Sequence, residues 1–388
     1  MTPYFTDDHL TVHIGDCRAV MAEMPAESVH CVVTSPPYWG LRDYGTATWE
    51  GGDAECDHRV GGQVAQTKHP AEGHATGQRP GVDAWWCVAC GARRIDAQLG
   101  LEPTPEAYVA NMVDVFREVR RVLRDDGTAW LNLGDSYTSG GRTTQVTDTA
   151  RRGQVVDGKR LGPGRRDLDG DAASGKQEYL NGTARPPVID HIGPKNLVGI
   201  PWRVAFALQA DGWYLRSDII WSKPNPMPES VTDRPTKAHE YLFLLAKSPR
   251  YYFDAEAVRE DGEGYGRSVW EKPQFKSGDI TRHHGNGDGH GTGAPTMQGG
   301  RNIRSVWTIT TQPYPGAHFA TFPEKLVEPC VKAGCPSEGV VLDPFAGSGT
   351  VGRVANRLGR RAVLIDLSAD YIDQAMLRNA QAPLGLGA

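Results

Sequence analysis

A polar turn follows an apolar run near the start of the chain, and its residue types suit chemistry on an amine. Val29 to Val33 predicts a buried strand that leads into Ser35-Pro36-Pro37-Tyr38. An amine attached to an aromatic base is a poor nucleophile because its lone pair is delocalised into the ring. The hydroxyl of Ser35 and the carbonyl of Pro36 can accept the two amine hydrogens and localise that lone pair, while the prolines keep both acceptors aimed. Tyr38 offers a flat face on which a base can stack, although the tetrapeptide alone is also compatible with a rigid structural turn.

A glycine-rich turn near the C-terminus is typical of a site for a nucleotide-like ligand. Gly339 to Asp343 predicts a strand, and a helix is expected to begin at Thr350. Glycines let the backbone approach a ligand closely, and the helix N-terminus offers N–H groups to an anion. The next predicted strand ends in Asp366, which is placed to accept hydrogen bonds from two ribose hydroxyls. The residues of the turn are Pro344, Phe345, Ala346, Gly347, Ser348 and Gly349.

The same turn also satisfies a pattern found in NAD enzymes. Gly347, Gly349 and Gly352 form G-x-G-x-x-G, and Asp366 follows about twenty residues later. Asp343 argues against a dinucleotide, because a carboxylate beside the turn would repel a pyrophosphate. S-adenosylmethionine carries an ammonium and a sulfonium, which a nearby carboxylate stabilises. The turn therefore favours S-adenosylmethionine, and an NAD-dependent oxidoreductase stays open as the alternative.

Apolar runs that predict strands alternate with helical patterns along the chain. The clearest helix should begin at the Thr104 cap and Pro105 and end near Gly127, and others should cover Pro201 to Ala210 and begin near Thr350. This alternation predicts the α/β class, with a mostly parallel central sheet flanked by helices. The predicted strands are Thr11 to Ile14, Val29 to Val33, Thr128 to Leu133, Tyr214 to Trp221, Tyr241 to Ala246, Val340 to Leu342 and Ala362 to Ile365.

Length and composition describe a chain that can fold without disulfides. Its 388 residues, 39% of them hydrophobic, are enough for one large core with insertions. Met1 to Leu10 lacks the apolar segment of a signal peptide, and no run of eighteen apolar residues occurs. The seven cysteines favour a reducing compartment, so we expect a cytoplasmic protein with no membrane segment. A net charge of −5 neither supports nor excludes binding to nucleic acid.

Three glycine-rich polar stretches, Gly51 to Asp96, Ser139 to Gly193 and Asp261 to Arg304, do not fit this core. We expect them to be insertions at the loop ends of the sheet, and the last two are also compatible with mobile surface loops. The predicted division has core segments at 1–50, 99–137, 196–260 and 305–388, and insertions at 51–98, 138–195 and 261–304.

The first insertion carries residues with metal-ligand spacing. Cys87-x-x-Cys90 is followed by glycine, and Cys56-x-His58 lies upstream. Two thiolates on a tight turn and two further soft ligands would complete the tetrahedron that zinc prefers. Zinc would also stabilise an insertion that has little apolar content. The alternatives are His69 or His74 as ligands, and a loop that holds reduced cysteines without metal.

Together these motifs resemble the β group of S-adenosylmethionine-dependent DNA amino-methyltransferases, in which the catalytic motif precedes the cofactor motif. The resemblance covers roughly two-thirds of the chain and implies a Rossmann-like methyltransferase fold. It implies that Ser35, Pro36, Pro37 and Tyr38 are catalytic and that the donor is bound by Asp16, Phe322, Asp343, Pro344, Phe345, Gly347, Ser348, Gly349, Thr350 and Asp366. Phe322 belongs to the segment His318 to Leu326, which resembles the cover of the donor's methionine end. Arg120 to Tyr137 and Ile219 to Lys247 resemble core segments of the family.

The resemblance also bears on the base that is modified. Serine rather than aspartate at position 35 is more often associated with cytosine N4 than with adenine N6, so cytosine N4 is favoured and adenine N6 is the alternative. Methylation at cytosine C5 would need a thiolate nucleophile. We do not expect Cys330 to serve, because it falls within a predicted helix, Phe322 to Ala333, where it is more simply a core residue.

The partner implied by the resemblance is double-stranded DNA from which the target base is flipped, and a cognate restriction nuclease is a further expected partner. The third insertion lies where this family usually carries target recognition. A non-catalytic DNA-binding module and an RNA or small-molecule methyltransferase stay open. The candidate DNA-binding residues are Arg151, Arg152, Lys159, Arg160, Arg165, Arg166 and Lys176, with Tyr265, Arg267, Trp270, Lys272, Arg282, His283, His284, Arg301 and Arg304 in the third insertion.

Overall fold

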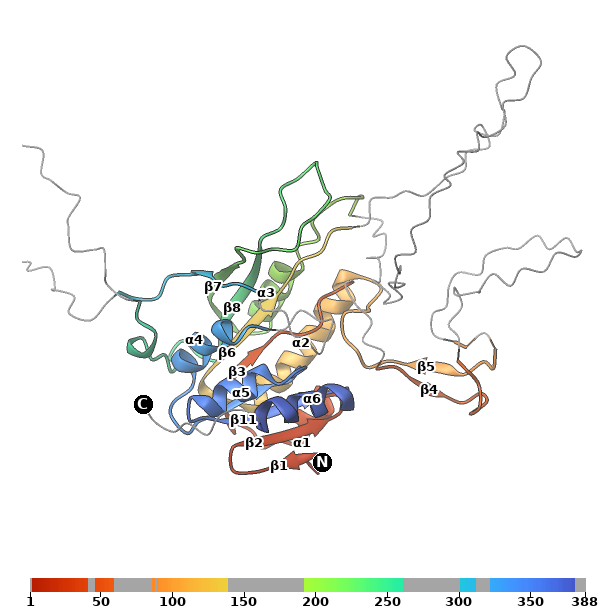
Figure 1. Cartoon of the computed structure of the whole chain (residues 1–388), viewed down its shortest axis with the longest axis horizontal. Coiled ribbons are helices and arrows are strands. Elements are labelled where there is room, and N and C mark those ends of the chain that lie inside the picture. Colours follow the sequence, from red (N-terminus) through yellow and green to blue (C-terminus); the bar gives the residue numbers. More distant parts are fainter. Residues whose placement is uncertain are drawn as a thin grey trace, which may run out of the picture. The chain divides into compact units, whose positions relative to one another are not determined.

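The computed structural model describes residues 2–40, 46–58, 86–87, 89–138, 192–260, 301–311 and 322–380 (Figure 1). The chain falls into two compact units. The first unit comprises Met1–Ser35, Val115–Asn132 and Leu208–Ala388, and the second comprises Pro36–Asp114 and Leu133–Ala207.

The first unit is built on a nine-stranded sheet with the order β1-β2-β11-β10-β3-β6-β8-β7-β9 (Figure 1). The five neighbours from β2 to β6 run parallel, which confirms the mostly parallel sheet expected from the sequence. β7 is antiparallel to β8, and β1 is antiparallel to β2. The strands are β1 (Phe5–Thr6), β2 (Leu10–Ile14), β3 (Val29–Thr34), β6 (Leu123–Leu133), β7 (Tyr214–Ser222), β8 (His239–Ala246), β9 (Val306–Thr308), β10 (Val340–Asp343) and β11 (Arg361–Asp366).

Helices cover the parallel strands of this sheet. α5 packs on β10 and β11, α6 packs on β11 and β2, and α4 packs on β3 and α5 (Figure 1). The contacts are apolar, because Val33, Val331, Val341, Val351 and Leu364 are fully buried. Burial on both faces explains why these strands read as continuous hydrophobic runs rather than as alternating ones. The helices are α1 (Cys17–Glu23), α2 (Pro105–Val122), α3 (Ile200–Ala210), α4 (Glu324–Gly334), α5 (Thr350–Arg357) and α6 (Ala369–Ala380), with a short 3-10 turn at Glu256–Val258.

All seven strands predicted from apolar runs are present, but the end predicted for α2 was wrong. The helix starts as expected, since the Thr104 hydroxyl accepts a hydrogen bond from Ala107 N at 3.2 Å. It ends at Val122 rather than near Gly127, and the chain enters β6 directly at Leu123. Leu123 is fully buried and pairs with Val29 across the sheet, so sheet pairing overrides the helical pattern there.

The second unit contains a separate two-stranded antiparallel sheet, formed by β4 (Thr48–Glu50) and β5 (Arg93–Ile95) (Figure 1). Within the same unit, Asp135 accepts hydrogen bonds from Gly199 N and Ile200 N and so caps the start of α3. In the part of the chain that the structure describes, no helix has the length and apolar character needed to cross a membrane.

Candidate active site

Four neighbouring parallel strands of the first unit end in candidate site residues. In the order β2, β11, β10, β3, the chain reaches Asp16, Asp366, Asp343 and Ser35 at or just beyond the strand ends. The strands that lead to them pair Ile14 with Asp366, Asp343 with Leu364, and Leu342 with Val32, so the four ends lie at one edge of the sheet. β3 and β10 are neighbours in the sheet, but the chain leads from β3 to β6 on one side of this pair and from β10 to β11 on the other side. Open α/β sheets bind ligands at such a switch point in strand order.

A direct hydrogen bond joins the two central strand ends. The hydroxyl of Thr34 donates to Asp343 Oδ1 at 2.7 Å, and both residues are buried. Ser35 is the next residue along the chain. The structure therefore brings the end of the strand before Ser-Pro-Pro-Tyr and the start of the glycine turn onto adjacent strands.

Two buried carboxyl groups lie at this edge, and a cation would stabilise their charged forms. Burial raises the pKa of Asp343 to about 7, although hydrogen bonds from Thr34 and from Phe345 N oppose the shift, and the charge of Asp366 adds to it. Burial also raises the pKa of Asp366, against hydrogen bonds from the N–H groups of Ser368 and Gly347. Both bonds to Asp343 fall on Oδ1, and among the described residues Oδ2 makes none. An ammonium would relieve the desolvation of these groups, whereas a pyrophosphate would add to it.

The glycine turn is held by the strand that follows it. Ala346 N donates to the carbonyl of Ile365 at 2.9 Å, and Gly347 N donates to Asp366 Oδ2 at 2.8 Å. Gly347 and Gly349 have φ of 48° and 72°, the left-handed region that favours glycine. A Cβ on Gly347 would meet nothing within 4 Å, whereas a Cβ on Gly349 would lie 2.7 Å from Ala375 Cβ. The turn is therefore open at Gly347 and tightly packed against α6 at Gly349.

Asn132 is a site residue that the sequence argument missed. Its Oδ1 accepts a hydrogen bond from Ser35 Oγ at 3.2 Å, and its Nδ2 donates to the carbonyl of Tyr241 at 3.0 Å. Asn132 is 1% exposed and lies in β6 beside the end of β3. The signal was a lone amide inside the apolar run Thr128 to Leu133, since a buried amide needs partners.

The remaining residues of the turn after β3 belong to the second unit. The carbonyl of Pro37 accepts a hydrogen bond from Tyr108 Oη at 2.9 Å. The ring of Tyr38 packs directly on Gly134, where a Cβ would lie 2.5 Å from Tyr38 Cε2. Gly134 is thus a second missed residue, because only a residue without a side chain leaves room for the ring.

Other predicted residues have the following environments. Asp16 caps α1 and is paired with Arg18; burial alone would raise its pKa, but the bonds from the Arg18 side chain and backbone lower it below the usual range. Phe322 is partly buried and packs on the core of the first unit. Cys330 lies inside α4 with no exposed surface, and burial raises the pKa of its thiol well above the usual value. The expectation that Cys330 is a core residue is confirmed.

The four predicted metal ligands come together in the second unit. Cys56 Sγ lies 3.8 Å from Cys87 Sγ, and Cys90 Sγ lies 3.3 Å from His58 Nδ1. All four ligand atoms lie within 4.8 Å of one another. A tetrahedral zinc with thiolates at about 2.3 Å would separate its sulfurs by about 3.8 Å, so the cluster fits such an ion.

Most of the residues predicted to contact DNA lie outside the described residues, as do His69 and His74. The exceptions are Arg301 and Arg304. Their side chains both contact the carboxylate of Glu260, at 2.7 Å and 2.9 Å, and Glu260 and Arg301 also exchange backbone hydrogen bonds.

Comparison with known sequences gives a consistent result. A family model described as DNA methylase, of the N6 and N4 type, matches residues 29–377. The type II methyltransferase M.SmaI of Serratia marcescens is 39% identical over 365 residues, which cover 94% of this chain and 89% of that protein. M.Cfr9I of Citrobacter freundii, also a type II methyltransferase, is 38% identical over 368 residues, covering 95% of this chain and 87% of that protein.

Solved structures show the same fold at low sequence identity. The PvuII cytosine-N4-specific DNA methyltransferase matches with a TM-score of 0.52 and 15% identity, covering 97% of this chain and 88% of that one. A DNA modification methylase from Thermus thermophilus, solved with S-adenosylmethionine, matches with a TM-score of 0.50 and 20% identity over 96% of this chain and 94% of that one. The predicted Rossmann-like methyltransferase fold is confirmed.

Proposed function

This chain belongs to the DNA methylase family of N6 and N4 amino-methyltransferases, and we propose that it methylates N4 of cytosine in duplex DNA, with S-adenosylmethionine as donor. Membership of the family decides against an NAD-dependent oxidoreductase. The observation that carries the proposal is the junction of β3 and β10, where Thr34 bonds Asp343 and Ser35 follows directly.

The residues at this edge fit S-adenosylmethionine better than a dinucleotide. Asp343 offers a buried carboxylate oxygen to an ammonium, and Asp366 has its carboxylate at the end of the neighbouring strand, where ribose hydroxyls can donate to it. When bound, S-adenosylmethionine supplies an electrophilic methyl group on a sulfonium. We assign donor binding to the residues that the family resemblance implied, namely Asp16, Phe322, Asp343, Pro344, Phe345, Gly347, Ser348, Gly349, Thr350 and Asp366.

Ser35 and the carbonyl of Pro36 are proposed to accept the two hydrogens of the target amine. The amide of Asn132 supports this role, because its Nδ2 donates to Tyr241 and its Oδ1 must therefore face Ser35. The hydrogen of the Ser35 hydroxyl then points to Asn132, so Ser35 Oγ would meet a base amine as an acceptor. Asn132 is thus a positioning residue, while Ser35 touches the substrate. The amine becomes acidic once it carries the methyl group, so water can take its extra proton.

Cytosine is favoured over adenine by the serine at position 35. The PvuII enzyme, which shares this fold, is named as cytosine-N4-specific. Type II relatives at 38% and 39% identity support a sequence-specific duplex substrate and a companion restriction nuclease. Tyr38 would stack on the flipped base, and the stretch 261–304 is proposed to carry target recognition.

The base can be identified directly. Duplex DNA of mixed sequence is incubated with the protein and isotopically labelled S-adenosylmethionine, digested to nucleosides, and analysed by mass spectrometry. We expect label in N4-methyl-2′-deoxycytidine, and RNA and free nucleotides serve as control substrates. Label in N6-methyl-2′-deoxyadenosine would keep the enzyme class and overturn the base, while absence of label from DNA would overturn the activity.

We also propose that Cys56, His58, Cys87 and Cys90 hold a structural zinc ion. The turn that carries Cys87 and Cys90 is held by backbone hydrogen bonds. Gly91 N donates to the carbonyl of Cys87 at 2.8 Å, and Cys87 N donates to the carbonyl of Ala92 at 2.7 Å. The His58 ring stacks on Trp49 with centroids 4.8 Å apart, which fixes the direction of its Nδ1. All four groups are ligands that zinc prefers.

A further inference from the structure

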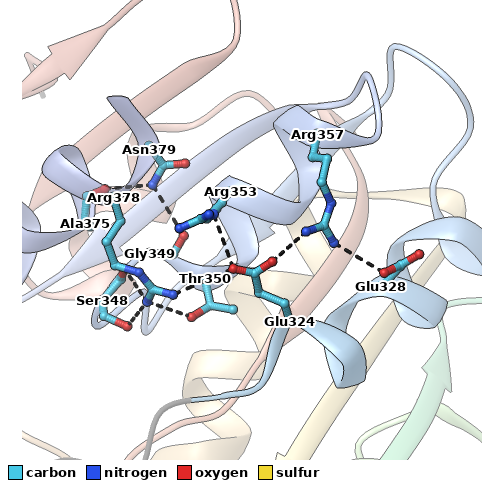
Figure 2. Close-up of polar contacts among 10 residues, drawn as sticks. All are labelled: Glu324, Glu328, Ser348, Gly349, Thr350, Arg353, Arg357, Ala375, Arg378 and Asn379. Atoms are coloured by element: carbon cyan, nitrogen blue, oxygen red, sulfur yellow. Dashed lines mark hydrogen bonds and ion pairs between the residues drawn. The ribbon is translucent and has the colours of Figure 1, made fainter. Parts of the chain in front are cut away.

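Arg378 contacts the glycine turn from α6, a helix that no motif of the sequence singled out. Its Nη1 lies 3.1 Å from the carbonyl oxygen of Ser348, 2.6 Å from Ser348 Oγ and 3.2 Å from Thr350 Oγ1 (Figure 2). The side chain is only 13% exposed. One guanidinium group therefore binds both hydroxyls that flank Gly349.

A buried cation at this place has an electrostatic cost. The contacts lie at the N-terminus of α5, where the helix dipole disfavours positive charge. Glu324, in the first turn of α4, compensates with a carboxylate 3.9 Å from Arg378 Nη2. The same carboxylate also pairs with Arg353 at 3.2 Å and with Arg357 at 2.6 Å (Figure 2). The network thus links the turn to the helix that begins just after Phe322.

The direction of these hydrogen bonds determines what the two hydroxyls can do. A guanidinium only donates, so Ser348 Oγ and Thr350 Oγ1 are acceptors for Arg378 Nη1, and they share its two hydrogens with the carbonyl oxygen of Ser348. Each hydroxyl keeps one hydrogen, and among the described residues neither is seen to donate it. Two polarised O–H donors therefore remain beside the N-terminus of α5, which itself favours an anion.

The rest of the turn is rigid, so these donors are held in place. Gly349 N donates to the carbonyl of Ala346 at 2.8 Å. The carbonyl of Gly349 accepts from Asn379 Nδ2 at 3.4 Å (Figure 2). Asn379 also donates to the carbonyl of Ala375 at 2.8 Å. Arg378 and Asn379 together hold the successive carbonyls of Ser348 and Gly349 from α6.

We propose that Arg378 is a positioning residue that makes Ser348 and Thr350 a subsite for the α-carboxylate of the methyl donor. This assignment rests on the proposed function. It divides the two charges of the donor's amino-acid end, with the ammonium assigned to Asp343 and the carboxylate to the hydroxyls that Arg378 orients. A donor that lacks the carboxylate should gain nothing from Arg378.

The test compares S-adenosylmethionine with its decarboxylated analogue, by calorimetric titration of the full chain. The wild type should bind S-adenosylmethionine more tightly. Arg378→Gln should weaken its binding about tenfold to hundredfold and leave the analogue's affinity unchanged, so that the preference is lost. Arg378→Lys should restore part of the preference. Arg357→Gln is the matched control, because Arg357 shares Glu324 but does not touch the turn.

An equal loss of affinity for both ligands in Arg378→Gln would reveal a merely structural role and overturn the proposal, as would an unchanged preference. If Arg378→Gln does not fold, Ser348→Ala carries the same test, since it removes one O–H donor and keeps the cation. A wild type that binds neither ligand would instead overturn the proposed function.

Discussion

The glycine turn of the first unit and the Cys/His cluster of the second are both small polar sites, but different forces hold them. The turn follows a strand pair whose residues Val341, Leu342 and Leu364 are fully buried. Residues of β11 and α6 both make hydrogen bonds to the turn. The cluster lies in the unit that contains β4 and β5. Each of these strands is three residues long and has an exposed residue at each end. Apolar burial can therefore fix the turn without a ligand, whereas the cluster would need the proposed zinc ion for the same rigidity.

The largest effect should follow from removal of zinc. We expect one zinc ion per chain after purification, and chelation should accelerate amide hydrogen exchange in β4 and β5 by several orders of magnitude, because structural zinc contributes about 10 kcal/mol or more in small domains. Exchange in β10 and β11 should not change. Cys90→Ser should reproduce the effect, while Cys330→Ala, outside the cluster, should retain the metal. If protein without zinc still showed slow amide hydrogen exchange in β5, the metal would not be what holds the cluster rigid.

Asp343→Asn should weaken donor binding and yet stabilise the fold. The amide oxygen can still accept from Thr34 and Phe345, so the variant removes the charge alone. We expect the dissociation constant for S-adenosylmethionine to rise by about a hundredfold or more. An equal dissociation constant in the variant would show that the carboxylate does not bind the donor.

The stability change has a defined dependence on pH. Burial raises the pKa of Asp343 to about 7, above its unfolded value, so folding favours the protonated form. That contribution is complete below about pH 4 and is lost as the pH rises through 7. Asparagine cannot ionise, so above pH 7 the variant should have a free energy of unfolding higher by about 2–4 kcal/mol, measured by urea denaturation. No gain at pH 8 would argue against a buried, desolvated carboxyl.

The two glycines of the turn should respond differently to alanine. Gly349→Ala combines a left-handed φ with a Cβ 2.7 Å from Ala375 Cβ, and should lower the free energy of unfolding by about 2–4 kcal/mol. Gly347→Ala, with open space at its Cβ, should cost only about 1 kcal/mol. Denaturation of both variants compares them directly, and equal losses would mean that α6 does not constrain the turn.

The smallest effect is the dependence of donor affinity on pH. An ammonium binds the ionised form of Asp343, so affinity should fall about fivefold to tenfold between pH 7 and pH 6 as the carboxyl becomes protonated. The Asp343→Asn variant should lack this dependence. Titrations with S-adenosylmethionine across pH 5.5 to 8.5 would measure it, and a flat profile in the wild type would remove Asp343 from the ammonium site.

The sequence located the seven longer strands of the large sheet because their signals are local, but it did not single out α1 or α6. Val29 to Val33 and Val340 to Leu342 are apolar runs bounded by turn residues, and both are strands. That β3 and β10 are neighbours could not be derived from local pattern, because about three hundred residues separate them and only the family resemblance implied that their ends meet.

The supporting residues were harder to find, for the same physical reason. Asn132 and Arg378 act through partners on distant segments, and an arginine on an amphipathic helix is normally a solvated surface residue. Gly134 matters only through the Tyr38 ring that packs on it. The periodicity of a sequence predicts which face of a helix or strand is apolar. It does not predict which polar groups of distant segments will contact that element.

Single-turnover methylation by Ser35→Ala tests the central claim most directly. Enzyme in excess is mixed with duplex DNA and labelled S-adenosylmethionine, and the first-order rate of transfer is measured together with the dissociation constants for donor and DNA. The predicted result is a rate lower by about a hundredfold to a thousandfold with both constants unchanged, because one acceptor for the amine hydrogens is lost. A variant that transfers at the wild-type rate would contradict the claim that the end of β3 performs the chemistry.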